Sequence, residues 1–305
     1  MKLTRITVSG FKSIDNRHEE TINFGDVCLV LGANGSGKSN LVSFFKMLGY
    51  MHTGALQNYV GTYGASQLLF YGPQITESIN FSITLEDDQT EDTYTVKLSH
   101  GLPNRLFVNG ERVSFYKKDR PKPQDYFLGS GGPETSLPSD HRQTSAILAK
   151  HLGKIQTFQF HDTSDTSRIR GDAYSDDVSY LRRDAGNLAA FLKMLKDSNA
   201  WRPYYERIVR HIRTVMPQFQ DFVLELSPDG HRSVRLNWTD KTRPDYLFGP
   251  DQISDGSLRF MALVTLLLQP PPFLPSVIVI DEPELGLHPA AIVELAGLIK
   301  PLSTS

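Results

Sequence analysis

The sequence has little that would cross-link, anchor or strongly charge the protein. Its single cysteine, Cys28, provides neither a disulfide framework nor a cysteine metal cluster. No apolar run approaches the roughly 20 residues of a membrane-spanning helix, and the N-terminus lacks the basic and apolar regions of a signal peptide. The formal net charge of −2 does not attract polyanions to the whole surface. We therefore expect a soluble, cytoplasmic, globular protein without a membrane partner.

The sequence does contain one complete phosphate-binding motif. Residues 32–39, GANGSGKS, match the Walker A pattern G-x-x-x-x-G-K-[ST] at every position. Residues 27–31 form an apolar run typical of a buried strand, in which Cys28 is expected to pack. Apolar residues then recur at helical spacing between Leu41 and Leu48. This order predicts a strand, a phosphate-binding loop and a helix.

The chemistry of that loop predicts how it binds ATP. Glycines allow the backbone N–H groups to surround the β-phosphate, and the following helix presents its positive end to the anion. Lys38 is expected to bridge the β- and γ-phosphates, and Ser39 to offer its hydroxyl to Mg²⁺. The ATP-binding residues predicted in this segment are Asn34, Gly35, Ser36, Gly37, Lys38, Ser39 and Asn40.

A second motif near the C-terminus predicts the other half of the site. Residues 277–280 are β-branched and apolar, a pattern typical of a strand at the centre of a parallel sheet, buried on both faces. Asp281 and Glu282 follow directly, as in a Walker B motif. Asp281 is expected in the Mg²⁺ shell, and Glu282 is expected to polarise the attacking water.

A serine and a glycine open an apolar helix between these two motifs. Ser254 and Gly256 precede residues 258–268, so free N–H groups and the helix dipole would face an anion. The order Walker A, Ser-x-Gly before a helix, then Walker B is the layout of an ABC-type ATPase.

Hydrophobic periodicity predicts the remaining elements. Alternation predicts strands at 2–8, 20–24, 78–85, 93–98, 106–108 and 113–115. The last four, with turns at 86–88 and 109–110, indicate an antiparallel meander. Residues 121–138, rich in Pro, Gly and Ser, are expected to be mobile. Helices are predicted near 142–151, 184–195 and 204–216, and a hairpin near 222–238.

The sequence resembles the RecF/SMC/OLD-type branch of ABC ATPases. Within that branch it is similar to small bacterial AAA family ATPases, several relatives of which belong to anti-phage defence systems. The matching segments are residues 10–13, 32–39, 160–164, 187–188, 254–260 and 281–289. The resemblance implies an α/β P-loop NTPase with an ABC-type head, made of a mixed sheet plus an antiparallel β meander, and a helical lobe.

The resemblance also implies a division of the chain. Residues 1–161 would form ATPase lobe I with the inserted antiparallel subdomain, and residues 162–250 a helical lobe II with a hairpin. Residues 251–305 would carry the signature helix and return to lobe I. Relatives continue with a strand that ends in a switch His or Gln, which this sequence lacks before Ser305. Either the chain is truncated or another segment provides the switch residue. Whether this chain alone hydrolyses ATP depends on which of the two is true.

By resemblance, several residues acquire roles. Ser254 and Gly256 would contact the γ-phosphate held by a partner subunit, so that a homodimer or higher homo-oligomer closes head-to-tail on ATP. Lys12 would reach the ATP phosphates of its own chain. The Q-loop residue would be Gln159 or His161, and both remain open. Gln159, Lys38 and Glu282 form the expected catalytic set.

The leading hypothesis is an ATP-hydrolysing molecular switch that relays its state to DNA or a protein effector, with a role in anti-phage defence. Arg207, Arg210 and Arg213 lie along one side of a predicted helix, which suits either a DNA contact or an ordinary solvated face. One alternative is a scaffold that binds ATP without hydrolysing it and holds an effector. Another is the nucleotide-binding subunit of a transporter, which the long 78–213 insertion disfavours.

Overall fold

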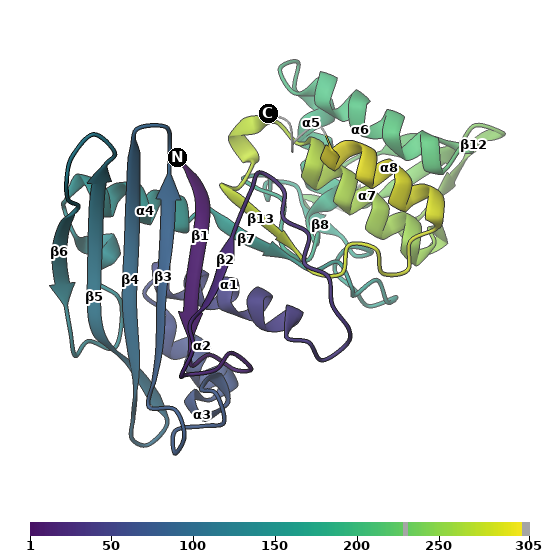
Figure 1. Cartoon of the computed structure of the whole chain (residues 1–305). Helices are drawn as coiled ribbons and strands as arrows, with labels where there is room; N and C mark the ends of the chain where they lie inside the picture. The colour runs from purple at the N-terminus through teal and green to yellow at the C-terminus, as the bar shows by residue number, and fades with distance from the viewer. Residues whose placement is uncertain (228–230, 301–305) are drawn as a thin grey trace. The chain divides into compact units, whose positions relative to one another are not determined.

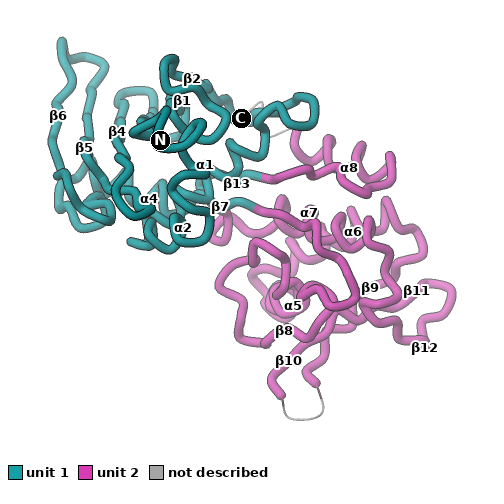
Figure 2. Tube along the Cα trace, turned by 90° about the horizontal axis from the view of Figure 1, so that it is seen from below, with its two compact units in different colours: residues 1–157, 275–279 teal, residues 158–274, 280–305 magenta. Residues whose placement is uncertain are grey.

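The computed structural model describes residues 1–227 and 231–300. The chain divides into two compact units, which are described separately (Figure 2). Unit 1 consists of residues 1–157 and 275–279, and unit 2 of residues 158–274 and 280–305. The mixed α/β elements agree with the predicted fold class. The three-segment division of lobes stays a prediction.

Unit 1 is built on a six-stranded sheet whose neighbouring strands are antiparallel (Figure 1). In spatial order the strands are β2 (Glu20–Asn23), β1 (Lys2–Ser9), β3 (Ser78–Glu86), β4 (Thr90–Gly101), β5 (Arg105–Lys117) and β6 (Gln124–Gly129). Their alternation of apolar and polar residues turns one face of the sheet toward the core. Ile79, Phe81 and Ile83 on β3 are all buried.

Unit 1 also contains four helices and a short 3-10 helix. The helices are α1 (Lys38–His52), α2 (Leu56–Tyr63), α3 (Ala65–Leu68) and α4 (Gln143–Leu152), and the 3-10 helix is η1 (Leu137–Ser139). Phe44 of α1 is fully buried, and its ring lies 5.2 Å from that of Phe81 in an edge-to-face arrangement. The Walker A helix is thereby anchored on the sheet by its apolar side.

Two local predictions in unit 1 are wrong. Asn109 and Gly110 form no turn, because β5 continues through them. The register shifts there, with Lys97 opposite Gly110 and Leu98 opposite Val108, so Asn109 is the extra residue of a β-bulge. The stretch expected to be mobile contains β6, which pairs with β5.

The segment before the Walker A loop also departs from its prediction. Residues 27–31 form no strand, and Leu29 and Leu31 are 74% and 80% exposed. Cys28 is exposed rather than packed in a core. A buried strand needs partners for its backbone N–H and C=O groups, and no described strand pairs with this segment. An apolar run has the composition of a buried strand, but it does not show whether another strand is available to pair with it.

The longest elements of unit 2 are helices. Its helices are α5 (Leu188–Asp197), α6 (Arg202–Val215), α7 (Asp255–Leu268) and α8 (Pro289–Ile299), with 3-10 helices η2 (Pro250–Gln252) and η3 (Pro271–Phe273). α7 is buried along most of its length, since nine of its residues are buried. His211 of α6 contacts Glu294 of α8 at 2.5 Å, which joins these two helices.

Two small sheets complete unit 2. The first pairs β8 (Ala173–Tyr174) with β10 (Ser233–Val234), and the second has the order β12 (Arg243–Phe248), β11 (Asn237–Asp240), β9 (Phe219–Val223). The two arms of the hairpin predicted near 222–238 pair with each other, since β9 and β11 are antiparallel neighbours. The turn predicted at 228–230 lies outside the described residues.

The Walker B strand exists but is not central. β13 (Val277–Ile280) pairs only with β7 (Ile155–Phe158) among the described strands. Two hydrogen bonds flank this pair: Ser276 N–H donates to Lys154 O, and Asp281 N–H donates to Phe158 O. Residue numbers increase in the same direction on both segments, so the two strands are parallel. All four β13 residues are half-buried rather than buried on both faces. The expected central position is therefore wrong, because β13 has one neighbour instead of two.

No helix in the described part of the chain is long and apolar enough to cross a membrane.

Candidate functional site

The Walker A loop has the backbone that its glycines permit. Gly35 and Gly37 have φ values of 81° and 97°, which side-chain-bearing residues rarely adopt. Gly37 is the N-cap of α1, and the helix has neither a capping side chain nor an acidic residue in its first turn. Among the described residues nothing accepts from the Lys38 and Ser39 N–H groups that begin this 15-residue helix, whereas the Asn40 N–H donates to Gly37 O at 2.9 Å. These features fit a bound phosphate group.

Lys38 folds back over the loop. Its ammonium donates to the carbonyl oxygens of Gly32 and Ala33 at 2.6 and 3.0 Å. Asn34, Gly35, Ser36 and Ser39 are exposed, and Gly37, Lys38 and Asn40 are half-buried. The predicted phosphate-binding residues of this loop thus lie together at the N-terminal end of α1.

Ser13, which follows Lys12, lies against the N-terminal end of α1. Asn40 donates from its side-chain amide to Ser13 Oγ at 2.6 Å. Ser13 Oγ also lies 2.9 Å from the position that a Cβ on Gly37 would occupy. Lys12 has a left-handed backbone (φ 51°) and donates its N–H to Leu68 O at 2.8 Å. The segment after β1 is therefore held between the Walker A loop and α3.

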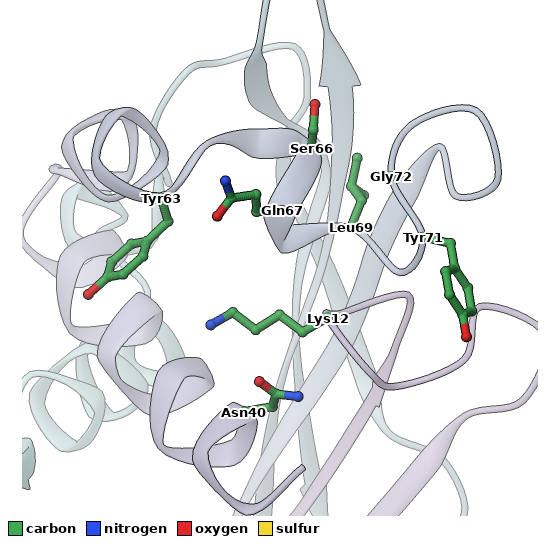
Figure 3. A pocket seen from close by; sticks show the side chains of 8 residues that line it. All are labelled: Lys12, Asn40, Tyr63, Ser66, Gln67, Leu69, Tyr71 and Gly72. Atoms are coloured by element: carbon green, nitrogen blue, oxygen red, sulfur yellow. The ribbon is translucent and has the colours of Figure 1, made fainter. Parts of the chain in front are cut away.

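The Lys12 side chain projects into a pocket of about 540 Å³ (Figure 3). Its ammonium donates to Ser43 Oγ at 2.6 Å and lies 5.6 Å from the ring centre of Tyr63. Burial, assisted by the positive charge of Lys46, lowers the pKa of Lys12. Among the described residues no carboxylate forms an ion pair with it. A partly desolvated cation with only neutral partners suits an anionic ligand. The pocket is lined by Lys12, Asn40, Tyr63, Ser66, Gln67, Leu69, Tyr71 and Gly72.

Unit 2 brings both Q-loop candidates to the Walker B carboxylates. Gln159 donates from Nε2 to Asp281 Oδ2 at 2.6 Å. His161 Nε2 lies 3.1 Å from the carbonyl oxygen of Asp281 and 3.8 Å from Glu282 Oε2. Glu282 has a φ of 47°, an uncommon value for a residue with a side chain. Its carboxylate stays partly exposed at 47%. An amide, an imidazole and two carboxylates therefore meet where β7 and β13 end.

The signature segment begins α7 as predicted. Ser254 is the N-cap, and its Oγ accepts from the N–H of Ser257 at 3.3 Å. A Cβ on Gly256 would lie 2.4 Å from the carbonyl oxygen of Gly286, so this position requires glycine. The signature helix and the turn after β13 are thus in close contact within unit 2.

Two arginines of unit 2 support this region, and sequence reasoning gave neither a role. Arg170 is only 5% exposed; it donates to Asp255 Oδ1 at 2.7 Å and to the carbonyl oxygens of Pro250 and Ile253. The bond from Arg170 holds the pKa of Asp255 below its usual value. Arg259 donates to three further carbonyl groups. Arg259 stood inside the matched segment 254–260, whereas no sequence signal distinguished Arg170 from a surface arginine.

No group of three or more His, Cys, Asp or Glu side chains in the described residues could hold a metal ion by itself. Mg²⁺ usually takes one or two protein ligands and completes its shell with water and phosphate oxygens. The sequence predicts Ser39 and Asp281 as the protein ligands of this ion. Their roles as ligands stay predictions.

The basic residues of α6 differ in their surroundings. Arg207 and Arg210 are exposed, whereas Arg213 donates to the carbonyl oxygen of Gln220. The stripe is therefore only partly available to a polyanion.

Comparison with known proteins decides the family. A family model described as "AAA domain, putative AbiEii toxin, Type IV TA system" matches residues 27–305. The chain belongs to this family. The match begins with the segment before the Walker A loop and includes both the signature segment and Walker B. No curated protein matches the chain in sequence.

Solved structures show the same fold for this AAA domain. One is an SMC head bound to the C-terminal winged-helix domain of ScpA, 17% identical, with a TM-score of 0.57 over 100% of this chain and 87% of that one. Another is an SMC head with an extended coiled coil bound to the C-terminal domain of ScpA, derived from Pyrococcus furiosus. It is 16% identical with a TM-score of 0.56, over 100% and 87% of the two chains. The resemblance to the SMC-like branch of ABC ATPases is thereby confirmed at the level of fold.

Proposed function

We propose that this AAA domain is an ATP-dependent molecular switch that binds and hydrolyses ATP. The observation that carries the proposal is the cluster at the ends of β7 and β13, in which Gln159 and His161 contact Asp281 and His161 approaches Glu282. A strand that merely ended in two exposed acids would not need an amide and an imidazole beside them. The Walker A loop at the start of α1 would provide the phosphate-binding element.

In this proposal each residue has a defined task. Lys38, Lys12 and the N–H groups that open α1 bind the phosphates, and Lys12 does so from its own pocket. Ser39 and Asp281 would be the protein ligands of Mg²⁺, and the ion would supply positive charge beside the phosphates. Glu282 accepts the proton of the attacking water, and Gln159 orients that water through its bond to Asp281.

The signature segment supports a head-to-tail homodimer. Ser254 and Gly256 open a 14-residue helix, and their N–H groups would contact the γ-phosphate bound by the second subunit. ATP would then close the dimer and hydrolysis would reopen it. Two structural relatives are SMC heads bound to ScpA. We therefore propose that a protein effector binds one state of the dimer in preference to the other, with DNA as the other candidate.

The biological setting we propose is bacterial anti-phage defence. The family description names a toxin of a toxin–antitoxin system, which supports this setting. The alternative is a scaffold that binds ATP without hydrolysing it. For the scaffold, no phosphate release is expected.

The decisive experiment compares Glu282→Gln with Lys38→Ala. With Mg-ATP, we expect Glu282→Gln to form a stable dimer in size exclusion with light scattering, because nucleotide binds but hydrolysis is blocked. Lys38→Ala should remain monomeric and release no phosphate. An ATPase activity that both substitutions leave unchanged would overturn the proposal. A wild-type dimer with ATP but without phosphate release would select the scaffold.

A further inference from the structure

Arg259 makes an unusual set of contacts within unit 2. Its Nε donates to Phe160 O at 3.0 Å, and Nη2 donates to His161 O at 2.7 Å. Its remaining nitrogen, Nη1, donates to Leu285 O at 3.0 Å. One side chain of α7 therefore joins the segment that follows β7 to the turn that follows β13.

The turn that Arg259 holds is built from uncommon backbone conformations. Glu282 and Gly286 both have positive φ values, 47° and 69°. Within this turn the Leu285 N–H donates to Glu282 O and the Leu287 N–H donates to Glu284 O, each at 3.1 Å. A residue such as Glu282 adopts a left-handed conformation only when its surroundings enforce it. The bond from Arg259 to Leu285 O provides such a restraint.

The glycines around Arg259 leave little room for movement. A Cβ on Gly286 would lie 2.4 Å from Arg259 Nη1, and one on Gly256 would lie 2.4 Å from Gly286 O. Gly256 and Arg259 are three residues apart on α7, so they face the same side of the helix. The start of α7 and the turn are packed too closely to shift independently.

Both segments that Arg259 joins carry site residues. His161 contacts Asp281 O through its ring and Arg259 through its carbonyl group. Glu282 begins the turn whose Leu285 carbonyl accepts from the same guanidinium. A planar guanidinium can serve three acceptors in fixed directions, whereas a lysine ammonium has a different shape and reach.

We propose that Arg259 is a positioning residue that couples the start of α7 to the Glu282 turn and to His161. Its catalytic consequence rests on the proposed function. When Ser254 and Gly256 engage a phosphate from the second subunit, the guanidinium holds Glu282 in the geometry that activates water. The signature helix α7 thereby controls the position of the Glu282 carboxylate in the same chain.

The test compares Arg259→Lys with wild type and with Arg235→Lys. Arg235 pairs with Asp251 at 2.6 Å on the surface of unit 2 and is a matched control for the loss of a guanidinium. Two measurements are made on the full chain: steady-state ATPase kinetics and amide hydrogen exchange over residues 282–287.

For Arg259→Lys we expect kcat to fall about tenfold or more while KM and the affinity for a fluorescent ATP analogue change by less than about twofold, since positioning is lost and binding is retained. Exchange of the Leu285 and Leu287 amides should become faster by about tenfold with an unchanged melting temperature. Arg235→Lys should resemble wild type in both measurements.

A kcat within about twofold of wild type, or unchanged exchange over residues 282–287, would overturn the coupling. If wild type itself shows no turnover, the proposed function fails, and the exchange measurement alone then decides whether Arg259 restrains the turn. We use Arg259→Lys in place of Arg259→Ala because lysine keeps the charge and most of the side-chain volume, so that the variant still folds.

Discussion

Gln159 donates a hydrogen bond of 2.6 Å to Asp281, although 122 positions separate them in the sequence. The bond joins the residue after β7 to the residue after β13. Of the two Q-loop candidates, Gln159 contacts the Walker B carboxylate itself, whereas His161 contacts its backbone carbonyl group and lies nearer Glu282. The structure thus brings both candidates to the site and gives them different neighbours.

This relationship yields the first prediction. Gln159→Leu removes the donor to Asp281 but keeps the side-chain size, so kcat should fall about 10- to 100-fold with a smaller change in ATP affinity. The Mg²⁺ concentration for half-maximal activity should rise. Gln156→Leu, a half-buried glutamine on β7, is the control and should retain activity. Equal activity of the two variants would remove Gln159 from the mechanism.

Lys12 provides the second prediction. Its half-buried ammonium has neutral partners, Ser43 and the Tyr63 ring, and its pKa is lowered by burial. Lys12→Gln should weaken binding of a fluorescent ATP analogue by about tenfold, the scale of one lost charge-assisted bond. Lys97→Gln, on an exposed position of β4, should bind like wild type. If Lys12→Gln also binds normally, its pocket does not receive the phosphates.

The close contact at Gly256 gives the third prediction. Gly256→Ala places a methyl group 2.4 Å from Gly286 O, so the free energy of unfolding should fall by about 1–3 kcal/mol and the ATP-induced dimer should be lost. Gly297 is a matched control, since a Cβ there meets nothing within 4 Å. Gly297→Ala should instead stabilise α8 by about 0.5–1 kcal/mol. Denaturant unfolding and light scattering measure both effects, and equal stability of the two variants would contradict the contact.

A buried acid outside the site gives the fourth prediction. Asp92 of β4 is 1% exposed, and neither carboxylate oxygen has a hydrogen-bond partner among the described residues. Burial, with a smaller effect of Asp87, raises the pKa of Asp92 to about 6. The folded state therefore favours the protonated form, and the free energy of unfolding should decrease as the pH rises from about 4 to about 6.

The variant Asp92→Asn tests that pH dependence. It should stabilise the protein by about 2–3 kcal/mol at pH 7.5 and by much less near pH 4, because an amide carries no charge to bury. Asp88→Asn, at an exposed position, should change the stability little at either pH. A difference between Asp92→Asn and wild type that is equal at both pH values would contradict a raised pKa.

The elements that depend on local pattern were predictable from the sequence. The strands β1, β3 and β4 alternate apolar and polar residues, the buried residues of α6 recur at helical spacing, and α7 is an apolar run after a serine N-cap. Gly35 and Gly37 of the Walker A motif have positive φ values, which glycine adopts readily. The Asn109–Gly110 turn failed because the same dipeptide also fits a β-bulge.

The sequence by itself determined the chemistry of the motifs, since residue type and spacing specify which groups can bind phosphate or accept a proton. Only the tertiary structure decided which strands pair, that residues 27–31 are exposed, and that Arg259 joins the segments around His161 and Glu282. These features depend on neighbours far away in the chain. Their positions follow from packing, which no local pattern records.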